Sequence, residues 1–220
     1  MKSMEFSDEL LAIARAGAGT NNIPVDVCAN KGIVVFNTPG ANANAVKELV
    51  IAAMFMAARN LPAGMQWVKE LETDVAKEVE KGKGQFAGRE ICGQTLGVVG
   101  LGAIGVLVAN TAQKLGMKVI GYDPFITLKS AHELSHKIDV TQDLAYLLDK
   151  SDFVSLHVPS VDSTKGMMDQ RRFAQMKEGS VLLNFSRDKL INETALLDAL
   201  ESEQDRKSTR LNSSHPAGSR

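Results

Sequence analysis

Short apolar runs alternate along the chain with segments in which apolar residues recur at helical spacing. The short runs are bounded by turn-forming residues, as is typical of strands, and fall at residues 10–14, 32–36, 96–99, 118–122, 153–158 and 180–185. The helical pattern begins near Asn44, is interrupted at Pro62 and Gly64, and returns at 68–83, 104–115, 142–148, 171–176 and 193–200. Strands that alternate with helices predict an α/β fold with a doubly wound parallel sheet.

Some segments carry no clear pattern. Residues 23–31 are only weakly periodic, 82–88 have the composition of a loop, and 126–140 are irregular. From Gln204 onward the chain is polar, rich in serine and aperiodic. We therefore expect residues 204–220 to be a disordered or non-native tail.

The most informative motif connects two predicted strands. Gly100, Gly102 and Gly105 follow one apolar run with G-x-G-x-x-G spacing, a helical pattern comes next, and Asp123 ends the following run. In this β-α-β order the glycines permit a tight turn, close approach of a pyrophosphate to a helix N-terminus, and close helix–strand packing. Asp123 follows Gly105 at close to the ~20 residues expected of a carboxylate that binds ribose hydroxyls. A carboxylate there repels a 2′-phosphate, so the sequence predicts NAD rather than NADP.

Composition and charge exclude several partners. The formal net charge is −1 and the pI is near 6.4, which gives no electrostatic basis for binding nucleic acid or an anionic membrane. Cys28 and Cys92 form no C-x-x-C motif, so we expect two reduced thiols and no metal site. The acidic residues after Lys2 argue against a signal peptide, and the apolar run at 49–58 is far shorter than the ~20 residues that span a bilayer. We expect a cytoplasmic protein.

A second motif predicts different chemistry. Residues 132–136 spell H-E-x-x-H, which on one helix places His132 and His136 on the same face, beside Glu133 that could activate a zinc-bound water. The motif lies between predicted strands, with no apolar run beside it and no evident third ligand. We interpret it as an exposed polar turn, and a zinc hydrolase stays the weakest alternative.

Two residues near predicted strand ends are candidates for chemistry, because ligands bind at the carboxyl ends of strands in doubly wound sheets. His157 lies at such an end, and we favour a structural or cofactor-lining role for it over a catalytic one. Arg187 follows the run at 180–185, and its planar guanidinium could hold a carboxylate in bidentate fashion and polarise a carbonyl. The alternative for Arg187 is an ordinary surface arginine.

Six stretches stand in a specific order between about residue 10 and about residue 200. They are RAGAGTNNIPVD, KGIVVFNTPGANANAVKELV, G-x-E-x-x-G-x-T-L-G-V-V-G-L-G-x-I-G, GYDP, SDFVSLHVP and LLNFSRDKLINETALLDAL. Together they resemble the D-isomer-specific 2-hydroxyacid dehydrogenases, and among these the members that act on 3-phosphoglycerate in serine biosynthesis.

The resemblance implies a role for each site residue. A loop whose N–H groups bind the substrate carboxylate would be formed by Gly17, Ala18 and Gly19. The implied cofactor-binding residues are Gly100, Gly102, Ala103, Ile104, Gly105, Asp123, Val158, Phe185, Ser186 and Arg187. Arg187 also matches the catalytic arginine of the family. Asp188 stands where the family has glycine, and we expect it to change loop geometry more than chemistry.

The resemblance also implies a reaction. It predicts an NAD-dependent oxidoreductase that transfers a hydride between NAD and a small D-2-hydroxy acid, in a parent protein that is a homo-oligomer. The family's proton-moving histidine and its glutamate have no match here, since His215 lacks the strand context. We therefore expect a fragment cut at both ends, with little turnover alone. A glyoxylate, hydroxypyruvate or 2-oxoglutarate reductase and a non-catalytic NAD-sensing protein stay open.

The same comparison predicts how the chain is divided. We expect residues 1–43 to be the remnant of an α/β substrate-binding domain. Residues 44–203 would form an NAD-binding Rossmann domain that is incomplete at its C-terminal end.

Overall fold

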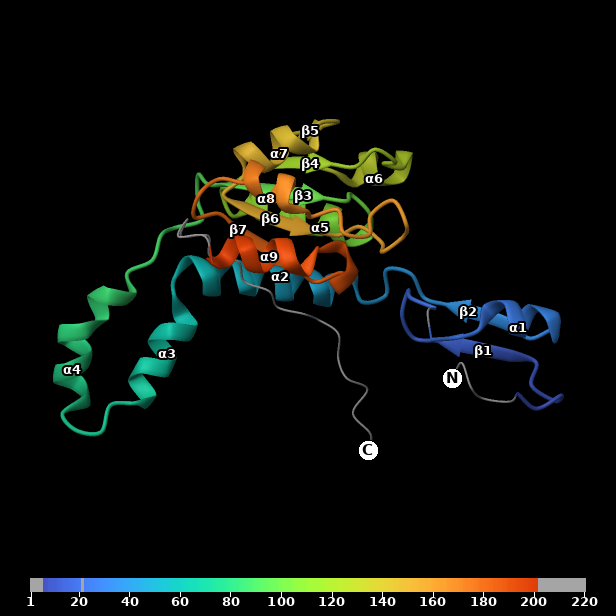
Figure 1. Ribbon diagram of the computed structural model, residues 1–220, viewed down its shortest axis with the longest axis horizontal. Helices are drawn as coiled ribbons and strands as arrows, with labels where there is room; N and C mark the ends of the chain where they lie inside the picture. The colour runs from blue at the N-terminus through green and yellow to red at the C-terminus, as the bar shows by residue number, and fades with distance from the viewer. Residues whose placement is uncertain (1–5, 21, 202–220) are drawn as a thin grey trace. The chain divides into compact units, whose positions relative to one another are not determined.

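The computed structural model describes residues 6–20 and 22–201 (Figure 1). It divides into two compact units, Met1–Val46 and Lys47–Arg220, and each is described by itself. The expected tail at 204–220 lies outside the described residues. The assignment of residues 1–43, 44–203 and 204–220 to a substrate domain, a nucleotide domain and a tail stays a prediction.

The first unit is built on two parallel strands. Its elements are β1 (Ala12–Arg15), α1 (Val25–Asn30), β2 (Val34–Asn37) and the first residues of α2 (Ala43–Ala58). Ala12 lies opposite Val34 in the β1–β2 pair. A small core of Ile23, Cys28 and Ile33 fills the space beneath them.

The weakly periodic segment 23–31 contains a helix that the sequence did not reveal. Parallel strands need a crossover connection, and α1 supplies it. Only Cys28 of α1 is buried, whereas Val25 and Val27 are exposed, so the segment has no apolar stripe to detect.

The second unit carries the rest of α2 and the remaining elements. Its helices are α3 (Leu61–Lys69), α4 (Val75–Gly82), η1 (Lys83–Phe86), α5 (Ala103–Lys114), α6 (Leu128–Glu133), α7 (Leu144–Lys150), α8 (Gln170–Gln175), η2 (Asp188–Leu190) and α9 (Glu193–Glu201). Its strands are β3 (Thr95–Val99), β4 (Lys118–Tyr122), β5 (Asp139–Thr141), β6 (Phe153–Leu156) and β7 (Val181–Asn184).

The five strands of the second unit form one parallel sheet in the order β5-β4-β3-β6-β7 (Figure 1). The chain runs outward from β3 to β4 and β5, then returns to the other side of β3 with β6 and β7. The strand order therefore reverses between β3 and β6, which confirms the predicted doubly wound sheet.

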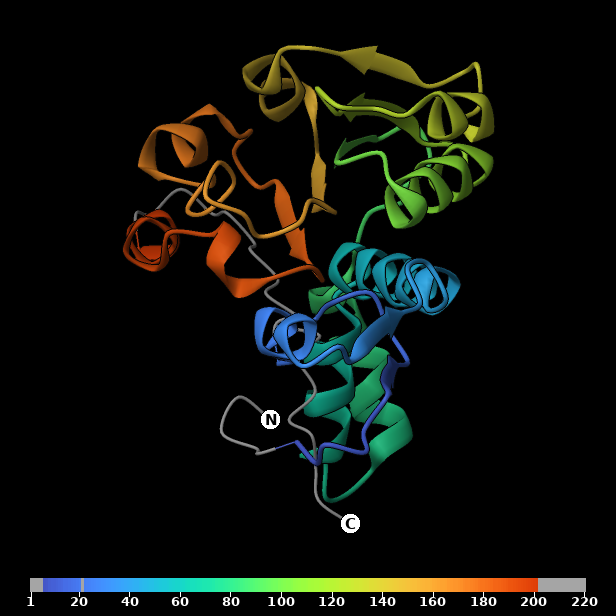
Figure 2. The ribbon, with the colours of Figure 1, turned by 90° about the vertical axis from the view of Figure 1, so that its right-hand side faces the viewer.

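Helices cover both faces of this sheet. Consecutive strand residues point to opposite faces, so neighbouring residues of β3 contact different helices. A Cβ on Gly97 of β3 would lie 2.4 Å from the Leu147 side chain of α7. On the other face, a Cβ on Gly105 of α5 would lie 3.4 Å from the Val98 side chain. Figure 2 shows the sheet between α5 and α6 on one side and α8 and α9 on the other.

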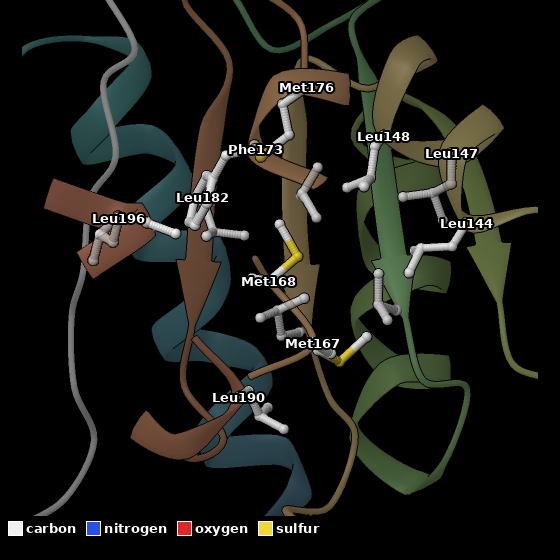
Figure 3. Close-up of a cluster of buried hydrophobic side chains, with 14 of the residues drawn as sticks. Leu144, Leu147, Leu148, Met167, Met168, Phe173, Met176, Leu182, Leu190 and Leu196 are labelled. Atoms are coloured by element: carbon white, nitrogen blue, oxygen red, sulfur yellow. The ribbon is translucent and has the colours of Figure 1, made fainter. Parts of the chain in front are cut away.

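One core cluster of the second unit lies on the face that α7, α8 and α9 cover (Figure 3). Its fully buried members include Leu147, Leu148, Met168 and Leu190. Leucine and methionine at helical spacing on α7 and beside α8 meet the valines and leucines of β6 and β7. This packing buries the strand residues that point to this face, which are Val154 and Leu156 of β6 and Leu182 of β7.

Three other predictions near the start of this unit are wrong. The predicted helix at 68–83 is interrupted, because α3 ends at Lys69 and α4 begins at Val75, after Asp74 with φ +48°. Pro62 does not break a helix, since it lies in the first turn of α3, where proline is tolerated. The break before α3 falls instead at Asn60, where φ is +51°. The predicted loop at 82–88 contains η1.

The irregular segment 126–140 is also structured. It contains α6 and the start of β5, the edge strand of the sheet. Neither element shows an apolar pattern, because α6 has no buried residue and every residue of β5 is at least partly exposed.

We predict that Leu147→Ala lowers the free energy of unfolding by about 2–5 kcal/mol, because it leaves a cavity between α7 and β3. Leu197→Ala is the matched control, since Leu197 is also on a helix but is 53% exposed. Urea unfolding followed by circular dichroism measures both. Equal losses in the two variants would contradict the assignment of the core.

Candidate functional site

Strand register gathers the candidate residues at one edge of the sheet. Val99 pairs with Tyr122 on one side and with Leu156 on the other, and Leu156 pairs with Asn184. These four residues end β3, β4, β6 and β7 in a single row. The residues that follow them, Gly100, Asp123, His157 and Phe185, therefore emerge together at the carboxyl edge, beside the point where the strand order reverses.

The glycine loop has a different constraint at each glycine. Gly100 has φ +95°, and its N–H donates to the Tyr122 carbonyl at 2.8 Å. A Cβ on Gly105 would lie 1.9 Å from the Gly100 carbonyl oxygen, so α5 packs on the loop only because residue 105 has no side chain. A Cβ on Gly102 would meet nothing within 4 Å. The protein's own packing therefore does not require glycine at 102, and open space lies in front of the helix.

The N-terminus of α5 faces that open space. Gly102 is its N-cap, and among the described residues no side chain caps this helix end. Ala103 is exposed and Ile104 is half-buried at the first two helical positions. The unpaired N–H groups of such an end, together with the helix dipole, favour an anion such as a pyrophosphate. The residues present thus fit a dinucleotide.

Two backbone N–H groups hold the Asp123 side chain in place, one from the glycine loop and one from the residues that follow Asp123. One carboxylate oxygen accepts the Leu101 N–H at 2.8 Å, and the other accepts the Phe125 N–H at 2.8 Å. Each oxygen keeps a further lone pair, and the side chain is half-buried. The carboxylate is therefore oriented beside the glycine loop and can still accept hydroxyl donors.

His157 follows β6 and packs directly against the glycine loop. A Cβ on Gly100 would lie 2.8 Å from the His157 carbonyl group and 2.9 Å from the Val158 side chain. The His157 Nε2 atom lies 2.9 Å from the buried Ser155 hydroxyl, whereas Nδ1 is buried with no partner among the described residues. Burial lowers the pKa of His157 to about 4, so the ring is neutral near pH 7.

The segment after β7 is held by a residue that sequence reasoning missed. The Asn184 side chain is buried, donates to the Arg187 carbonyl at 2.8 Å and accepts the Ser186 N–H at 3.1 Å. The Ser186 hydroxyl donates to the Leu156 carbonyl at 2.8 Å. Phe185 is buried, and the Arg187 side chain is exposed. The available signal was an asparagine inside the otherwise apolar run LLNF.

In the first unit, the loop after β1 is tied to the end of β2. Gly17 has φ +140°, and its N–H donates to the Thr38 hydroxyl at 2.7 Å. The Asn37 side chain donates to the Ala18 carbonyl at 2.8 Å. Within the described part of the chain, the N–H groups of Ala18 and Gly19 have no partner, so these two can donate to a ligand, whereas that of Gly17 is engaged.

The H-E-x-x-H motif at residues 132–136 does not lie on one continuous helix. His132 and Glu133 end α6, and His136 lies beyond it, with both imidazoles exposed. Within residues 6–20 and 22–201 no group of three or more metal-ligating side chains comes together. Cys28 and Cys92 are both free, the first buried and the second exposed. None of the described helices combines the length and apolarity needed to cross a bilayer.

The family model described as the NAD binding domain of D-isomer specific 2-hydroxyacid dehydrogenases matches residues 51–208. The chain therefore belongs to this family of nicotinamide-dependent enzymes. This match confirms the resemblance seen in the sequence motifs, and it makes NAD the cofactor of the matched domain.

Relatives and solved structures agree with this assignment. The chain is 37% identical over 198 residues to D-3-phosphoglycerate dehydrogenase of Methanocaldococcus jannaschii, and 37% identical over 199 residues to that of Pongo abelii. Each match covers 90% of this chain, which spans about a third of the relatives, 36% and 35%.

Two solved structures have the same fold over most of the chain. D-mandelate dehydrogenase of Rhodotorula graminis in its holo form has a TM-score of 0.80 at 28% identity, with 97% of this chain and 62% of that one covered. D-lactate dehydrogenase of Aquifex aeolicus, complexed with NAD and lactic acid, has a TM-score of 0.73 at 29% identity, with 91% and 57% covered.

The desolvated ring of His157, whose Nδ1 atom is buried, predicts a pH dependence of stability. Its folded pKa of about 4 is below the unfolded value near 6.5, so between these values the unfolded chain binds more protons. Stability from this group is present above pH 6.5 and is lost as the pH falls toward 4, by at most about 1.4 kcal/mol per unit. Urea unfolding at pH 7, 6 and 5 measures the slope.

His157→Gln should flatten this slope, because the amide does not titrate. His132→Gln is the control, since that imidazole is exposed. The same slope in the parent and in His157→Gln would contradict the buried neutral ring.

Proposed function

We propose that this chain is the cofactor-binding part of an NAD-dependent dehydrogenase that interconverts a D-2-hydroxy acid and its 2-oxo acid. The single observation that carries the proposal is the row formed by Val99, Tyr122, Leu156 and Asn184, which brings the glycine loop, Asp123 and Arg187 to one sheet edge. The names of the curated relatives favour 3-phosphoglycerate as substrate, hence a step in serine biosynthesis. We further propose a cytoplasmic homo-oligomer as the parent protein.

Different residues at the carboxyl edge bind different parts of the dinucleotide. N–H groups at Gly102, Ala103 and Ile104 bind the pyrophosphate, with the close packing at Gly100 and Gly105 giving it access. Asp123 accepts the ribose hydroxyls. Val158, Phe185 and Ser186 line the nicotinamide side.

The substrate is held by donors that suit a 2-oxo or 2-hydroxy carboxylate. In the first unit, the loop at Gly17–Gly19 offers the N–H groups of Ala18 and Gly19 to a carboxylate, and the positive φ of Gly17 sets the turn of this loop. In the second unit, Arg187 is the proposed catalytic residue, because a planar guanidinium can hold a carboxylate in bidentate fashion and polarise a carbonyl. NAD, when bound, supplies the acceptor for the hydride from C2.

The cofactor part of the proposal is tested by Gly102→Ser. The serine side chain enters the open space in front of α5, and its hydroxyl can cap the N–H groups that the pyrophosphate needs. Calorimetry should show NAD affinity lower by about tenfold or more, with stability unchanged within about 0.5 kcal/mol. Gly84→Ser is the control, because that glycine also has nothing within 4 Å and lies in η1.

Binding of NADP completes that test. The chain without substitutions should bind NADP more weakly than NAD, because Asp123 repels the 2′-phosphate. A folded Gly102→Ser variant that binds NAD as the parent does would contradict the proposed pyrophosphate site.

The catalytic part is tested in the full-length protein that contains this chain. Turnover on 3-phosphoglycerate is compared with reduction of hydroxypyruvate, glyoxylate and 2-oxoglutarate. Arg187→Lys should lower kcat/KM by roughly 10²-fold, because lysine loses the bidentate fork. Arg171→Lys is the control, since Arg171 is an exposed arginine of α8. NAD binding without turnover on any of the four acids would favour a non-catalytic NAD-sensing protein.

A further inference from the structure

A second pocket lies at the opposite edge of the sheet. Its volume is about 460 Å³, within the range of small-molecule sites. Thr95, Lys118 and Asp139, the first residues of β3, β4 and β5, all line it. Because parallel strands share one direction, this amino edge is remote from the carboxyl edge where Gly100 and Asp123 lie. The pocket is therefore distinct from the proposed dinucleotide site.

Four lysine side chains line this pocket, although the chain as a whole has a net charge of −1. They come from four separate segments: Lys118 from β4, Lys137 from the residues before β5, Lys150 from the end of α7 and Lys177 from the turn after α8. Such convergence from distant parts of the sequence concentrates positive charge in one hollow.

The carboxylates around the pocket are fewer than the lysines, and one of them has a partner on each oxygen. Asp152 accepts the Thr95 N–H at 2.8 Å with one oxygen and pairs with Lys177 at 3.1 Å with the other. This contact fixes Lys177 beside the pocket. Lys150 pairs with the exposed Asp149 at 2.7 Å, and such a surface pair is worth little. Among the described residues, Asp139 is the one carboxylate that lines the pocket.

Of the four lysines that line the pocket, Lys118 and Lys137 give the strongest indication of an anionic ligand. Within the described residues neither ammonium group has an ion pair. A lysine in the last turn of a helix is explained by the helix dipole, as for Lys150. Lys118 opens a strand and Lys137 lies between α6 and β5, so this explanation does not apply to them. Both residues are exposed and line the same hollow, so an anion bound there would interact favourably with two ammonium groups that have no carboxylate partner among the described residues.

The lining of the pocket also includes apolar residues. Met117, Val119 and Ile120 are buried, and the half-exposed Tyr146 ring lies at its side. Gln113 adds an amide that can donate a hydrogen bond. A hollow lined by cationic and amide donors from several segments suits a compact anionic ligand.

We propose that this lysine-lined pocket binds a small diphosphate-bearing metabolite. Two phosphate groups match the two unpaired ammonium groups, with Lys150 and Lys177 as further donors. The proposal does not depend on the dehydrogenase activity, because it rests on residues of the opposite sheet edge.

Inorganic pyrophosphate is the probe, titrated calorimetrically into the 220-residue chain at low salt with and without saturating NAD. We expect binding at one site with NAD present, since the glycine loop is then occupied. Lys118→Gln combined with Lys137→Gln should weaken it by at least about tenfold. Lys77→Gln combined with Lys129→Gln removes the same charge from exposed helix positions and should leave the affinity within about twofold. Circular dichroism checks that both double variants are folded.

Several outcomes would overturn the proposal. They are loss of pyrophosphate binding when NAD is added, equal weakening by the two double variants, and no binding at millimolar pyrophosphate. Tighter binding of single-stranded nucleic acid than of pyrophosphate would replace the small ligand by a macromolecule and would also overturn it. If the chain fails to bind NAD but binds pyrophosphate through Lys118 and Lys137, the proposed function fails and this inference stands.

Discussion

The in-register parallel pairing of β4, β3, β6 and β7 is the constraint on which the rest of the second unit depends. Since the four strands end in one row, their following residues emerge at one edge with no further folding device. Val99, with a neighbour on each side, is the centre of that row. A shift of one residue in β6 would turn His157 away from Gly100 and place Ser186 out of reach of the Leu156 carbonyl.

Close packing of helices on β3 then positions the N-terminus of α5 at this edge of the sheet. Gly105 lets α5 approach the Gly100 carbonyl, and Gly97 lets α7 approach β3 from the opposite face. A side chain at either position would push a helix away from the central strand. The absence of a side chain at Gly105 keeps the N-terminus of α5 close to the glycine loop. The absence of a side chain at Gly97 lets Leu147 pack into the core. Both effects come from missing side chains, so the same residue type supports recognition at one place and stability at the other.

The sequence predicted the central elements well because their signals are local. The strand at 118–122 and the helix near 104–115 are buried on the faces that their apolar residues mark. The short elements α1, α6 and β5 escaped prediction because tertiary pairing, rather than an apolar pattern, supports them. For the candidate site residues, glycine spacing predicted the loop at 100–105. The hydrogen bonds of Asn184 in the second unit and the engaged N–H of Gly17 in the first depend on backbone positions that no spacing encodes.

The two edges of the sheet differ in what an anion can use. At the carboxyl edge α5 begins, so its N–H groups and the positive end of its dipole are available, and the loop needs no cationic side chain. At the amino edge α5 and α7 end, so their carbonyl groups and the negative ends of their dipoles are presented. An anion there requires side-chain charge to offset those carbonyl groups. The lysines at 118, 137, 150 and 177 supply it, whereas the glycine loop achieves the same effect from backbone alone.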